Sequence, residues 1–325
     1  MIAASPGVPA AAPPPPVRPL LKWAGGKRQL LPHIRRFVPD HFPRYLEPFF
    51  GSGAVFFDLH SRGLLAGRPA ILLDINADLV GCYGAVRDEP EAVIAALRRL
   101  ARGHAQAPEA HYYRVRDGRF NPAREKRRHD GTIAYTPALA AMLIYLNRTG
   151  FNGLFRVNRQ GRFNVPAGRY ARPAICDADH LRRVSAALRG PHVRLALTSF
   201  DAVETLAQAG DFVYLDPPYV PVSRTAHFTA YTPCPFGPAE QARLQQIAIA
   251  LARRGCGVLL SNSTAPDVAR LYDGHPEAVA AGLRAYRVPA RRAINARATG
   301  RGPVAEYLIT NLPERETEPG AAGRC

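Results

Sequence analysis

The fold of this chain is constrained most by a repeated pattern. A short apolar segment ends on a glycine or an acidic residue, and a helical pattern follows it. The segment YLEPF leads into Gly51–Gly53 and a helix through Leu59, and AILLD ends at Asp74. The all-apolar segment Phe212–Leu215 stops in the same way at Asp216. A strand, a glycine turn, a helix and a second strand in that order form half of a parallel α/β sheet. We therefore predict a doubly wound α/β fold.

The rest of the chain continues this alternation, with one interruption in the middle. We expect further helices over Ala77–Val86, Pro90–Arg102, Ala178–Leu188, Ala202–Ala209 and Pro238–Arg253, and further strands over His192–Leu197, 257–261, Arg284–Val288 and Glu306–Thr310. Between them, Thr136–Arg148 predicts a buried helix, and Gly153–Pro166 predicts a hairpin because it alternates and has Asn and Gly at its bend. This region interrupts the alternation of strands and helices, so we interpret it as an insertion.

The strand ends are the expected binding edge. In a doubly wound sheet, ligands bind beyond the carboxyl ends of the strands. Phe49–Gly53, Asp74, Asp216–Tyr219 and the pair at 261–262 all follow such ends. We therefore expect these residues to converge.

The charge points to a polyanionic partner. The 325 residues are 47% hydrophobic, enough for a sizeable core, and carry a formal charge of +17. Between His111 and Arg172 there are thirteen Lys and Arg and three acids, so this stretch holds +10 of that charge. It is the candidate nucleic-acid face. The alternative is a compositional preference for arginine, which the presence of only three lysines supports.

The sequence gives no sign of a membrane span or of export. The longest apolar run, Ala138–Leu146, has about half the length that a spanning helix needs. The five cysteines are scattered without a C-x-x-C pair, which argues against a disulfide framework and a thiolate metal site. We expect a cytoplasmic protein without a metal, with a disordered Pro/Ala tail over 1–19 and a flexible tail over 314–325.

The turn Glu47-Pro-Phe-Phe-Gly-Ser-Gly53 resembles a cofactor loop. Its glycines would let the main chain approach a ligand closely. A dinucleotide fingerprint would have a third glycine where Phe56 stands, so a cofactor without a pyrophosphate, such as S-adenosylmethionine, fits better. Asp74, at the end of the next strand, is placed to accept hydrogen bonds from two ribose hydroxyls. A merely structural tight turn is the alternative.

Asp216-Pro217-Pro218-Tyr219 is the sharpest motif. The prolines stiffen the turn, so the Asp216 carboxylate and the Pro217 carbonyl are two acceptors at a fixed separation. Two such acceptors match the exocyclic amine of an adenine, and Tyr219 offers a face on which the base can stack. Together they would offset the few kcal/mol that base extrusion costs. The alternative is an ordinary turn in a proline-rich chain.

The segment LLKWAGGK holds the only tryptophan, Trp23, and two of the three lysines. A glycine pair before a helix suggests a turn that faces a ligand, with Lys27 near a carboxylate and Trp23 against a flat surface. Equally, Trp23 could simply pack a helix onto the core.

Taken together, LLKWAGGK, EPFFGSG, LLDIN, YLNRTGFNGLFRVNRQGRFNVPAGRY and YLDPPY resemble the Dam-type adenine-N6 DNA methyltransferases. The resemblance covers nearly everything from Leu20 to Leu312. It implies a Rossmann-like methyltransferase sheet over 20–103 and 176–313, with a helical-plus-hairpin target recognition domain inserted at 104–175. The implied activity is methyl transfer from S-adenosylmethionine to N6 of a flipped adenine in double-stranded DNA, with no metal.

The resemblance also assigns roles to single positions. Asp216, Pro217 and Tyr219 are the expected catalytic residues. The expected cofactor contacts are Trp23, Lys27, Glu47, Phe49, Gly51, Gly53, Asp74 and Asp216. The expected DNA contacts are Lys22, Phe151, Asn152, Leu154, Arg156, Pro166, Arg169 and Tyr170. Phe151 stands where many relatives carry tyrosine, which removes a hydroxyl but keeps a ring able to stack or wedge.

GATC is the first expected target, because the hairpin keeps the leucine, arginine and proline that such enzymes use for the outer bases. A bacterial or phage enzyme of this kind would act as a monomer on nucleoid DNA, alone or beside a restriction nuclease. The rivals are an RNA adenine-N6 methyltransferase and a non-catalytic DNA-binding protein. The basic run 124–128 looks like an addition to the family pattern, and we expect it to contact phosphates or to form a solvated loop.

Overall fold

A seven-stranded mixed sheet organises the protein in this computed structural model, which describes residues 15–23, 25–220, 236–291 and 303–315. The strand order is β5-β2-β1-β6-β7-β9-β8. β5, β2, β1, β6 and β7 run parallel, whereas β9 is antiparallel to both β7 and β8. The strands are β1 (Tyr45–Glu47), β2 (Ala70–Asp74), β5 (Val193–Leu197), β6 (Phe212–Leu215), β7 (Gly257–Ser263), β8 (Arg284–Arg291) and β9 (Pro303–Thr310). The predicted α/β sheet is confirmed.

Two layers of helices cover the sheet because successive strand residues face opposite sides. In β6, Phe212 and Tyr214 join a core that includes α2, α3 and α8, whereas Val213 and Leu215 join a core that includes α9–α12. The helices are α1 (Leu31–Ile34), α2 (Ala54–Ser61), α3 (Ala77–Asp88), α8 (Ala178–Leu188), α9 (Ala202–Leu206), α10 (Pro238–Arg253), α11 (Pro266–Tyr272) and α12 (Pro276–Ala280). Short 3-10 turns flank α1 at Lys27–Gln29 and Arg35–Phe37.

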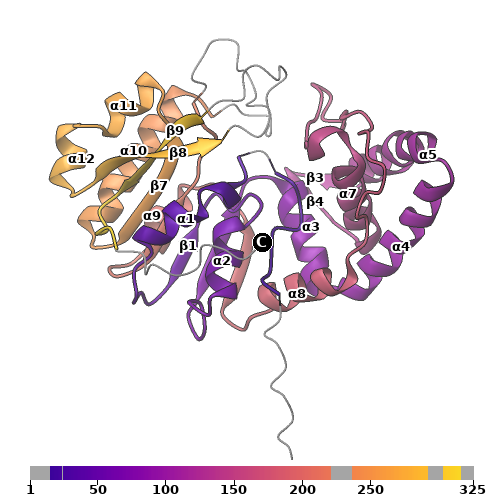
Figure 1. The fold of residues 1–325 in the computed structure, drawn as a ribbon, viewed down its shortest axis with the longest axis horizontal. Coiled ribbons are helices and arrows are strands. Elements are labelled where there is room, and N and C mark those ends of the chain that lie inside the picture. The colour runs from indigo at the N-terminus through magenta and orange to yellow at the C-terminus, as the bar shows by residue number, and fades with distance from the viewer. Residues whose placement is uncertain (1–14, 24, 221–235, 292–302, 316–325) are drawn as a thin grey trace, which may run out of the picture.

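The interruption forms a helical body at one end of the molecule, with α10–α12 at the other end (Figure 1). Its elements are α4 (Pro90–Gln106), α5 (Pro108–Val115), a π-helical turn (Arg116–Phe120), α6 (Asn121–Lys126), β3 (Arg128–His129), β4 (Thr132–Ile133), α7 (Pro137–Thr149) and a 3-10 turn (Phe151–Gly153). The predicted buried helix is α7, which ten buried residues place in the middle of this body. α4 packs against it, so the helical body begins at Pro90. The division of the chain into domains at 103 and 176 stays a prediction.

The predicted hairpin is present, although its arms are irregular. The bend is a turn at Asn158–Gly161, where the Gly161 N–H donates to the Asn158 carbonyl at 2.8 Å. An isolated bridge joins Val157 to Phe163, and no regular ladder forms between the arms. We call residues 153–166 the 153–166 hairpin.

The prediction that the basic run 124–128 contacts phosphates or forms a solvated loop is wrong for Arg124. The run forms the end of α6 and the start of β3 instead of a loop. Arg124 is 6% exposed and is paired with Asp78, so it cannot contact a phosphate. A buried guanidinium needs such a partner, because an unpaired charge in a core is costly.

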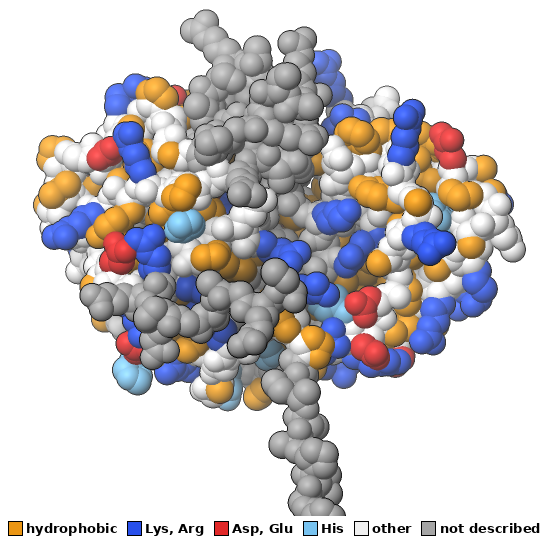
Figure 2. Space-filling model, in the orientation of Figure 1, with side chains coloured by type: hydrophobic (Ala, Val, Ile, Leu, Met, Phe, Trp, Pro, Cys, Tyr) orange, Lys and Arg blue, Asp and Glu red, His pale blue; other side chains and the backbone are white. Residues whose placement is uncertain are grey.

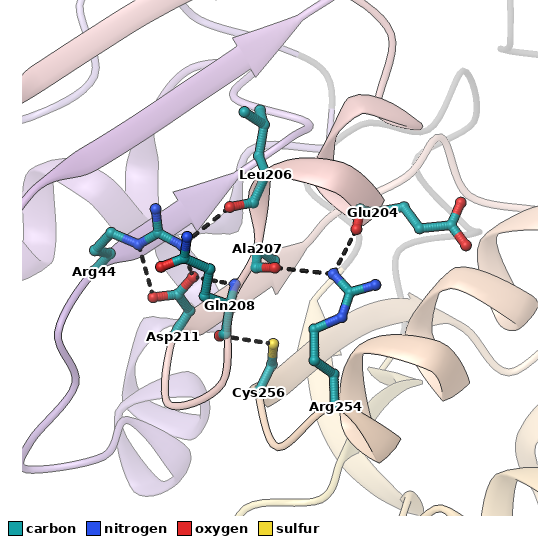
Figure 3. Close-up of polar contacts among 8 residues, drawn as sticks. All are labelled: Arg44, Glu204, Leu206, Ala207, Gln208, Asp211, Arg254 and Cys256. Carbon is teal, nitrogen blue, oxygen red and sulfur yellow. Dashed lines mark hydrogen bonds and ion pairs between the residues drawn. The ribbon is translucent and has the colours of Figure 1, made fainter.

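Polar contacts connect the loops at the amino ends of β1, β6 and β7, on the side of the sheet away from the carboxyl ends of these strands (Figure 3). Arg44, just before β1, donates to the Asp211 carboxylate at 2.9 Å and to the Leu206 carbonyl at 3.0 Å. Asp211 also accepts from the main-chain N–H of Gln208 at 2.7 Å, and Arg254 donates to the Ala207 carbonyl at 2.9 Å. These contacts draw the chain out of the helical path, so α9 ends at Leu206 and not at Ala209 as predicted.

Among the residues that the structure describes, none of the helices has the length and hydropathy of a membrane span. Over the same residues, His, Cys, Asp and Glu side chains do not gather in a group of three that could bind a metal.

Candidate active site and DNA-facing surface

A lysine and a serine hold the carboxylate that follows β6. The Lys27 Nζ lies 2.7 Å from Asp216 Oδ1 and also donates to the Gly25 carbonyl at 2.6 Å. Ser261, on β7, donates to the same Asp216 oxygen at 3.0 Å. Both partners use Oδ1, and no other described residue donates to Oδ2. Burial raises the pKa of the Asp216 carboxyl, and the Lys27 ammonium opposes that rise. The described part of the chain therefore holds one oxygen of this carboxylate and leaves the other without a donor.

Two contacts fix the Tyr219 side chain, one at its hydroxyl and one on a face of its ring. Its hydroxyl donates to Glu306 Oε2, on β9, at 2.8 Å. The Lys27 Nζ lies 4.3 Å from the centroid of the Tyr219 ring, close enough for a cation–π contact. One lysine thus touches both ends of the Asp-Pro-Pro-Tyr turn.

A second set of polar contacts fixes the backbone of that turn. The Gln241 side chain, on α10, donates to the Pro218 carbonyl at 3.0 Å, and Asn262 donates to the Gln241 side-chain oxygen at 3.0 Å. Ser263 donates to the Val220 carbonyl at 2.7 Å. Gln241 and Asn262 are buried, so water does not compete for these bonds. The turn is therefore preorganised by the neighbouring helix and strand.

The glycine turn after β1 has the backbone that only glycine adopts readily. Gly51 and Gly53 have φ values of 50° and 70°, and a Cβ on Gly53 would lie 2.5 Å from the Phe50 ring. The Gly51 and Asn76 main-chain N–H groups each donate to the Asp74 carboxylate at 2.8 Å. Burial raises the pKa of Asp74 to about 6, and main-chain hydrogen bonds from Asn76, Gly51 and Ile75 oppose the rise. The predicted convergence of the strand ends is confirmed.

Apolar side chains lie beside Asp74 and the glycine turn. The Phe49 ring stacks on Phe200 with centroids 5.1 Å apart, and it meets the Phe236 ring edge-on at 5.7 Å. Ile75, directly after Asp74, is 60% exposed, which is unusual for a large aliphatic side chain. Phe49 follows β1 and Ile75 follows β2, so both lie at the carboxyl ends of neighbouring parallel strands, as Asp74 does.

Trp23 contacts both the glycine turn and the 153–166 hairpin. Its ring stacks on Phe155 with centroids 5.2 Å apart, and a Cβ on Gly51 would lie 3.6 Å from it. Glu47 lies deeper: it is 2% exposed and accepts a hydrogen bond from the Tyr45 hydroxyl at 2.9 Å. Burial raises the pKa of Glu47 well above its ordinary value.

Lys22 joins the first segment of the chain to the hairpin. Its main chain exchanges two hydrogen bonds of 2.8 Å with the Asn147 side chain, which also donates to the Gly153 carbonyl at 2.7 Å. A Cβ on Gly153 would lie 2.4 Å from the Lys22 side chain, so only glycine fits there. The Lys22 Nζ lies 4.8 Å from the Tyr170 ring centroid.

The other predicted DNA contacts lie on an accessible surface. The Phe151 ring is 50% exposed, and its main-chain N–H donates to the Pro166 carbonyl at 2.9 Å. Arg156 is exposed and donates to the Asn164 side chain at 2.8 Å. Asn152 and Arg169 are also exposed, and Leu154 is half-buried.

The basic stretch from His111 to Arg172 is largely at the surface. Lys and Arg side chains are spread over the helical body in Figure 2. Nine of its thirteen basic residues are exposed: Arg114, Arg119, Lys126, Arg128, Arg156, Arg159, Arg162, Arg169 and Arg172.

Several residues at this edge had no signal in the sequence strong enough to single them out. Glu306 stands in a strand without a motif, and Gln241 looks like any polar residue of an amphipathic helix. Phe200 follows a strand end, as Phe49 does, and that placement could have marked it. Ile75 could have been marked by its position after Asp74.

Comparison with known proteins decides the family. The family model for D12 class N6 adenine-specific DNA methyltransferases matches residues 23–292. The chain belongs to this family. It is therefore an enzyme that methylates adenine at N6 in DNA, and the family implies S-adenosylmethionine as the methyl donor.

Named relatives span three quarters of the chain or more. The type II methyltransferase M1.LlaDCHI of Lactococcus lactis subsp. cremoris is 36% identical over 91% of this chain and 95% of its own length. The DNA adenine methylase of Vibrio cholerae serotype O1 is 34% identical over 93% and 98%, and that of Escherichia coli (strain K12) is 37% identical over 75% and 80%. Among solved structures, the rRNA methyltransferase aviRa from Streptomyces viridochromogenes, at a TM-score of 0.33 and 14% identity over 93% of this chain and 88% of that one, is too distant to bear on the substrate.

Proposed function

We propose that this D12-class enzyme flips an adenine out of duplex DNA and binds it in a pocket made by Asp216, Pro217 and Tyr219. The observation that carries the proposal is the state of the Asp216 carboxylate. One oxygen is committed to Lys27 and Ser261, and the other is left for a ligand by the described residues. The rigid turn sets that oxygen and the Pro217 carbonyl at a fixed separation.

These two acceptors activate the amine. The N6 lone pair of adenine is delocalised into the ring, so the amine is a poor nucleophile. Two hydrogen bonds, one to Asp216 and one to Pro217, favour the tetrahedral nitrogen in which the lone pair can attack. When bound, S-adenosylmethionine supplies a methyl group on a positively charged sulfur. As the bond from N6 to the methyl carbon forms, the bond from that carbon to sulfur breaks. The proton that N6 loses leaves toward the Asp216 carboxylate, which already accepts its hydrogen bond.

The residues beside the glycine turn suit S-adenosylmethionine. Asp74 would accept hydrogen bonds from the ribose hydroxyls, because an ionised carboxylate has more acceptor sites than its three main-chain donors use. Ile75 and the rings of Phe49 and Phe200 offer an apolar surface of the kind that an adenine needs. We further expect Trp23, Lys27, Glu47, Gly51 and Gly53 to complete this subsite.

The 153–166 hairpin and its neighbours are the proposed DNA-reading surface. Arg156 can donate two parallel hydrogen bonds to a guanine edge in the major groove. The exposed Phe151 ring can wedge between base pairs or stack on the orphaned base, as apolar side chains do in kinked DNA. Lys22, Asn152, Leu154, Pro166, Arg169 and Tyr170 would supply further contacts.

Three finer assignments belong to this proposal. GATC is the expected site, the enzyme is expected to act as a monomer, and its DNA substrate would place it in the cytoplasm at the nucleoid. A role beside a restriction nuclease is compatible with the type II methyltransferases among its relatives.

One experiment tests the function directly. The chain is expressed in a host that lacks adenine methylation, and the modified adenines are mapped by sequencing. We expect N6-methyladenine within one short sequence, GATC. Another sequence would replace GATC and leave the mechanism standing. Methylation confined to RNA, in a competition between duplex DNA and structured RNA, would refute the proposed substrate.

A further inference from the structure

The second arm of the 153–166 hairpin is held by side chains of the helical body. Alternate main-chain carbonyls, at Gly161, Phe163 and Val165, each accept a hydrogen bond from a side chain. Asn121 grips Phe163 twice: its amide donates to the carbonyl at 3.0 Å and its oxygen accepts from the N–H at 2.8 Å. A residue of a neighbouring β-strand would exchange the same pair of bonds.

Side chains before and after Asn121 in the sequence make similar contacts with this arm. They belong to α5, the π-turn and α6, residues 108–126, which we call the helical rail. At one end, the Tyr112 hydroxyl and the Arg116 guanidinium each donate to the Val165 carbonyl at 2.9 Å. At the other end, Arg124 donates to the Gly161 carbonyl. Four side chains of the rail therefore follow the two-residue spacing of an extended strand.

The π-turn brings these side chains into line. The Asn121 main-chain N–H donates to the Arg116 carbonyl, five residues back. In a regular α-helix, residues five apart lie about 140° apart around the axis, so Arg116 and Asn121 would face different directions. The wider π-turn reduces that separation, and such turns recur at functional sites.

Arg124 also connects the helical rail to α3, the helix that follows Asp74. Its guanidinium makes two hydrogen bonds of 2.6 Å to the Asp78 carboxylate, and the Tyr135 hydroxyl donates to Asp78 at 2.9 Å. Asp78 lies in the first turn of α3, and the N-cap of that helix is Asn76, whose N–H binds Asp74. Side chains of Arg124 and Asp78 are 7% and 4% exposed, so this pair is shielded from solvent.

From these contacts we infer that the helical rail sets the register of the 153–166 hairpin, and that Arg124 is the positioning residue that fixes the hairpin tip relative to α3. The inference rests on the proposed role of the hairpin in reading DNA. A bidentate ion pair fixes both the distance and the direction of its partners. Base readout needs side chains in place to within about 1 Å, since displacements of that size far from the chemistry can reduce rates about a hundredfold.

A phosphate contact by Arg124 would require a rearrangement that exposes its buried side chain, and it would give a different readout from a positioning contact. A lost phosphate contact weakens binding to all sequences alike and lowers the salt dependence of binding, the slope of log K against log salt, by about one. A lost positioning contact lowers discrimination between sites and leaves that slope unchanged.

The test compares Arg124→Met with Lys126→Met, which removes the same charge from an exposed residue two positions away. The substrates are duplexes with the mapped site and with each single-base variant of it. We expect Arg124→Met to lower the ratio of kcat/KM between the mapped site and its best variant by about tenfold or more. Lys126→Met should leave the ratio within about twofold of the wild type. The affinity for S-adenosylmethionine, measured by calorimetry, should not change in either variant.

Two controls keep the result interpretable. Arg124→Met leaves Asp78 buried without its partner, so the double variant Asp78→Asn/Arg124→Met, which removes both charges, must show the same loss of discrimination. An unchanged ratio in both variants overturns the inference, and so does an unchanged ratio with a lower salt slope. Arg156→Ala checks the proposed function separately: if that variant keeps full discrimination too, the hairpin does not read the site, and the error lies in the proposed function.

Discussion

Tyr219 allows the stacking and the hydrogen-bonding parts of the target pocket to be measured separately. Tyr219→Phe keeps the ring, and with it the Lys27 contact at 4.3 Å, but loses the 2.8 Å hydrogen bond to Glu306. Glu306 is half-buried, so water can replace the hydroxyl. The cost is then that of an ordinary hydrogen bond, about 1 kcal/mol, or roughly a fivefold loss in kcat/KM.

Tyr219→Ala removes the ring as well. Base stacking on an aromatic side chain contributes about 1 to 3 kcal/mol, so the alanine variant should fall a further 5- to 150-fold, roughly, below the phenylalanine variant. The assay is the initial methylation rate of a duplex oligonucleotide at saturating S-adenosylmethionine. Glu306→Gln is the matched control, because its amide oxygen can still accept from Tyr219, and it should stay within about fivefold of the wild type. Equal losses in the phenylalanine and alanine variants would refute the stacking role.

Three further predictions concern the catalytic carboxylate, the cofactor side and the fold. Asp216→Ala should nearly abolish methylation and leave duplex binding measurable in a gel shift, since most exposed basic residues of the helical body lie elsewhere; retained turnover would remove Asp216 from the mechanism. Because burial raises the pKa of Asp74 to about 6, protonation below that pH should weaken S-adenosylmethionine binding in calorimetry, and Asp74→Asn should bind weakly with no such pH dependence. Gly53→Ala should lower the free energy of unfolding by about 2 to 5 kcal/mol, because it adds backbone strain and a clash with Phe50. Gly63 is the control: it has a similar φ of 73° and nothing within 4 Å, so Gly63→Ala should cost only about 1 to 2 kcal/mol. Equal urea midpoints for the two variants would contradict this prediction.

Where the sequence predicted the fold well, the signals were local and agreed with one another. The bounds of β2 and β6 match because both are short apolar runs that end at an acid. The bounds of α8 and α10 match as well: Asp177 caps α8, and α10 begins at a proline. In each case, burial and end signals point to the same residues.

The helical rail could not be predicted in this way. α5 and α6 are short and polar, so they lack the apolar period that marks a helix. Their stability comes from partners far away in the sequence, such as the pairing of Arg124 with Asp78. A run of basic residues gives no sign of which member will be buried, because that depends on a carboxylate 46 positions earlier in the chain.

The candidate site shows the same division. Asp216, Asp74 and the glycine turn follow strand ends, so the topology alone brings them to one edge. Lys27 stands in a motif, and its contact with Asp216 could be expected from its charge. Glu306 and Gln241 were missed because nothing around them in the sequence distinguishes a residue that orients the turn from any other polar residue.

The way in which the 153–166 hairpin is held also affects how this protein can change over evolutionary time. Main-chain pairing between strands is nearly indifferent to residue identity, so a point mutation seldom moves one strand against the next. Here the second arm depends on Asn121, Arg124 and their neighbours, and each of these is one codon change away from losing its bond. Under the proposed role of the hairpin, target preference in a lineage of such enzymes can therefore drift through residues that only support the DNA-reading surface.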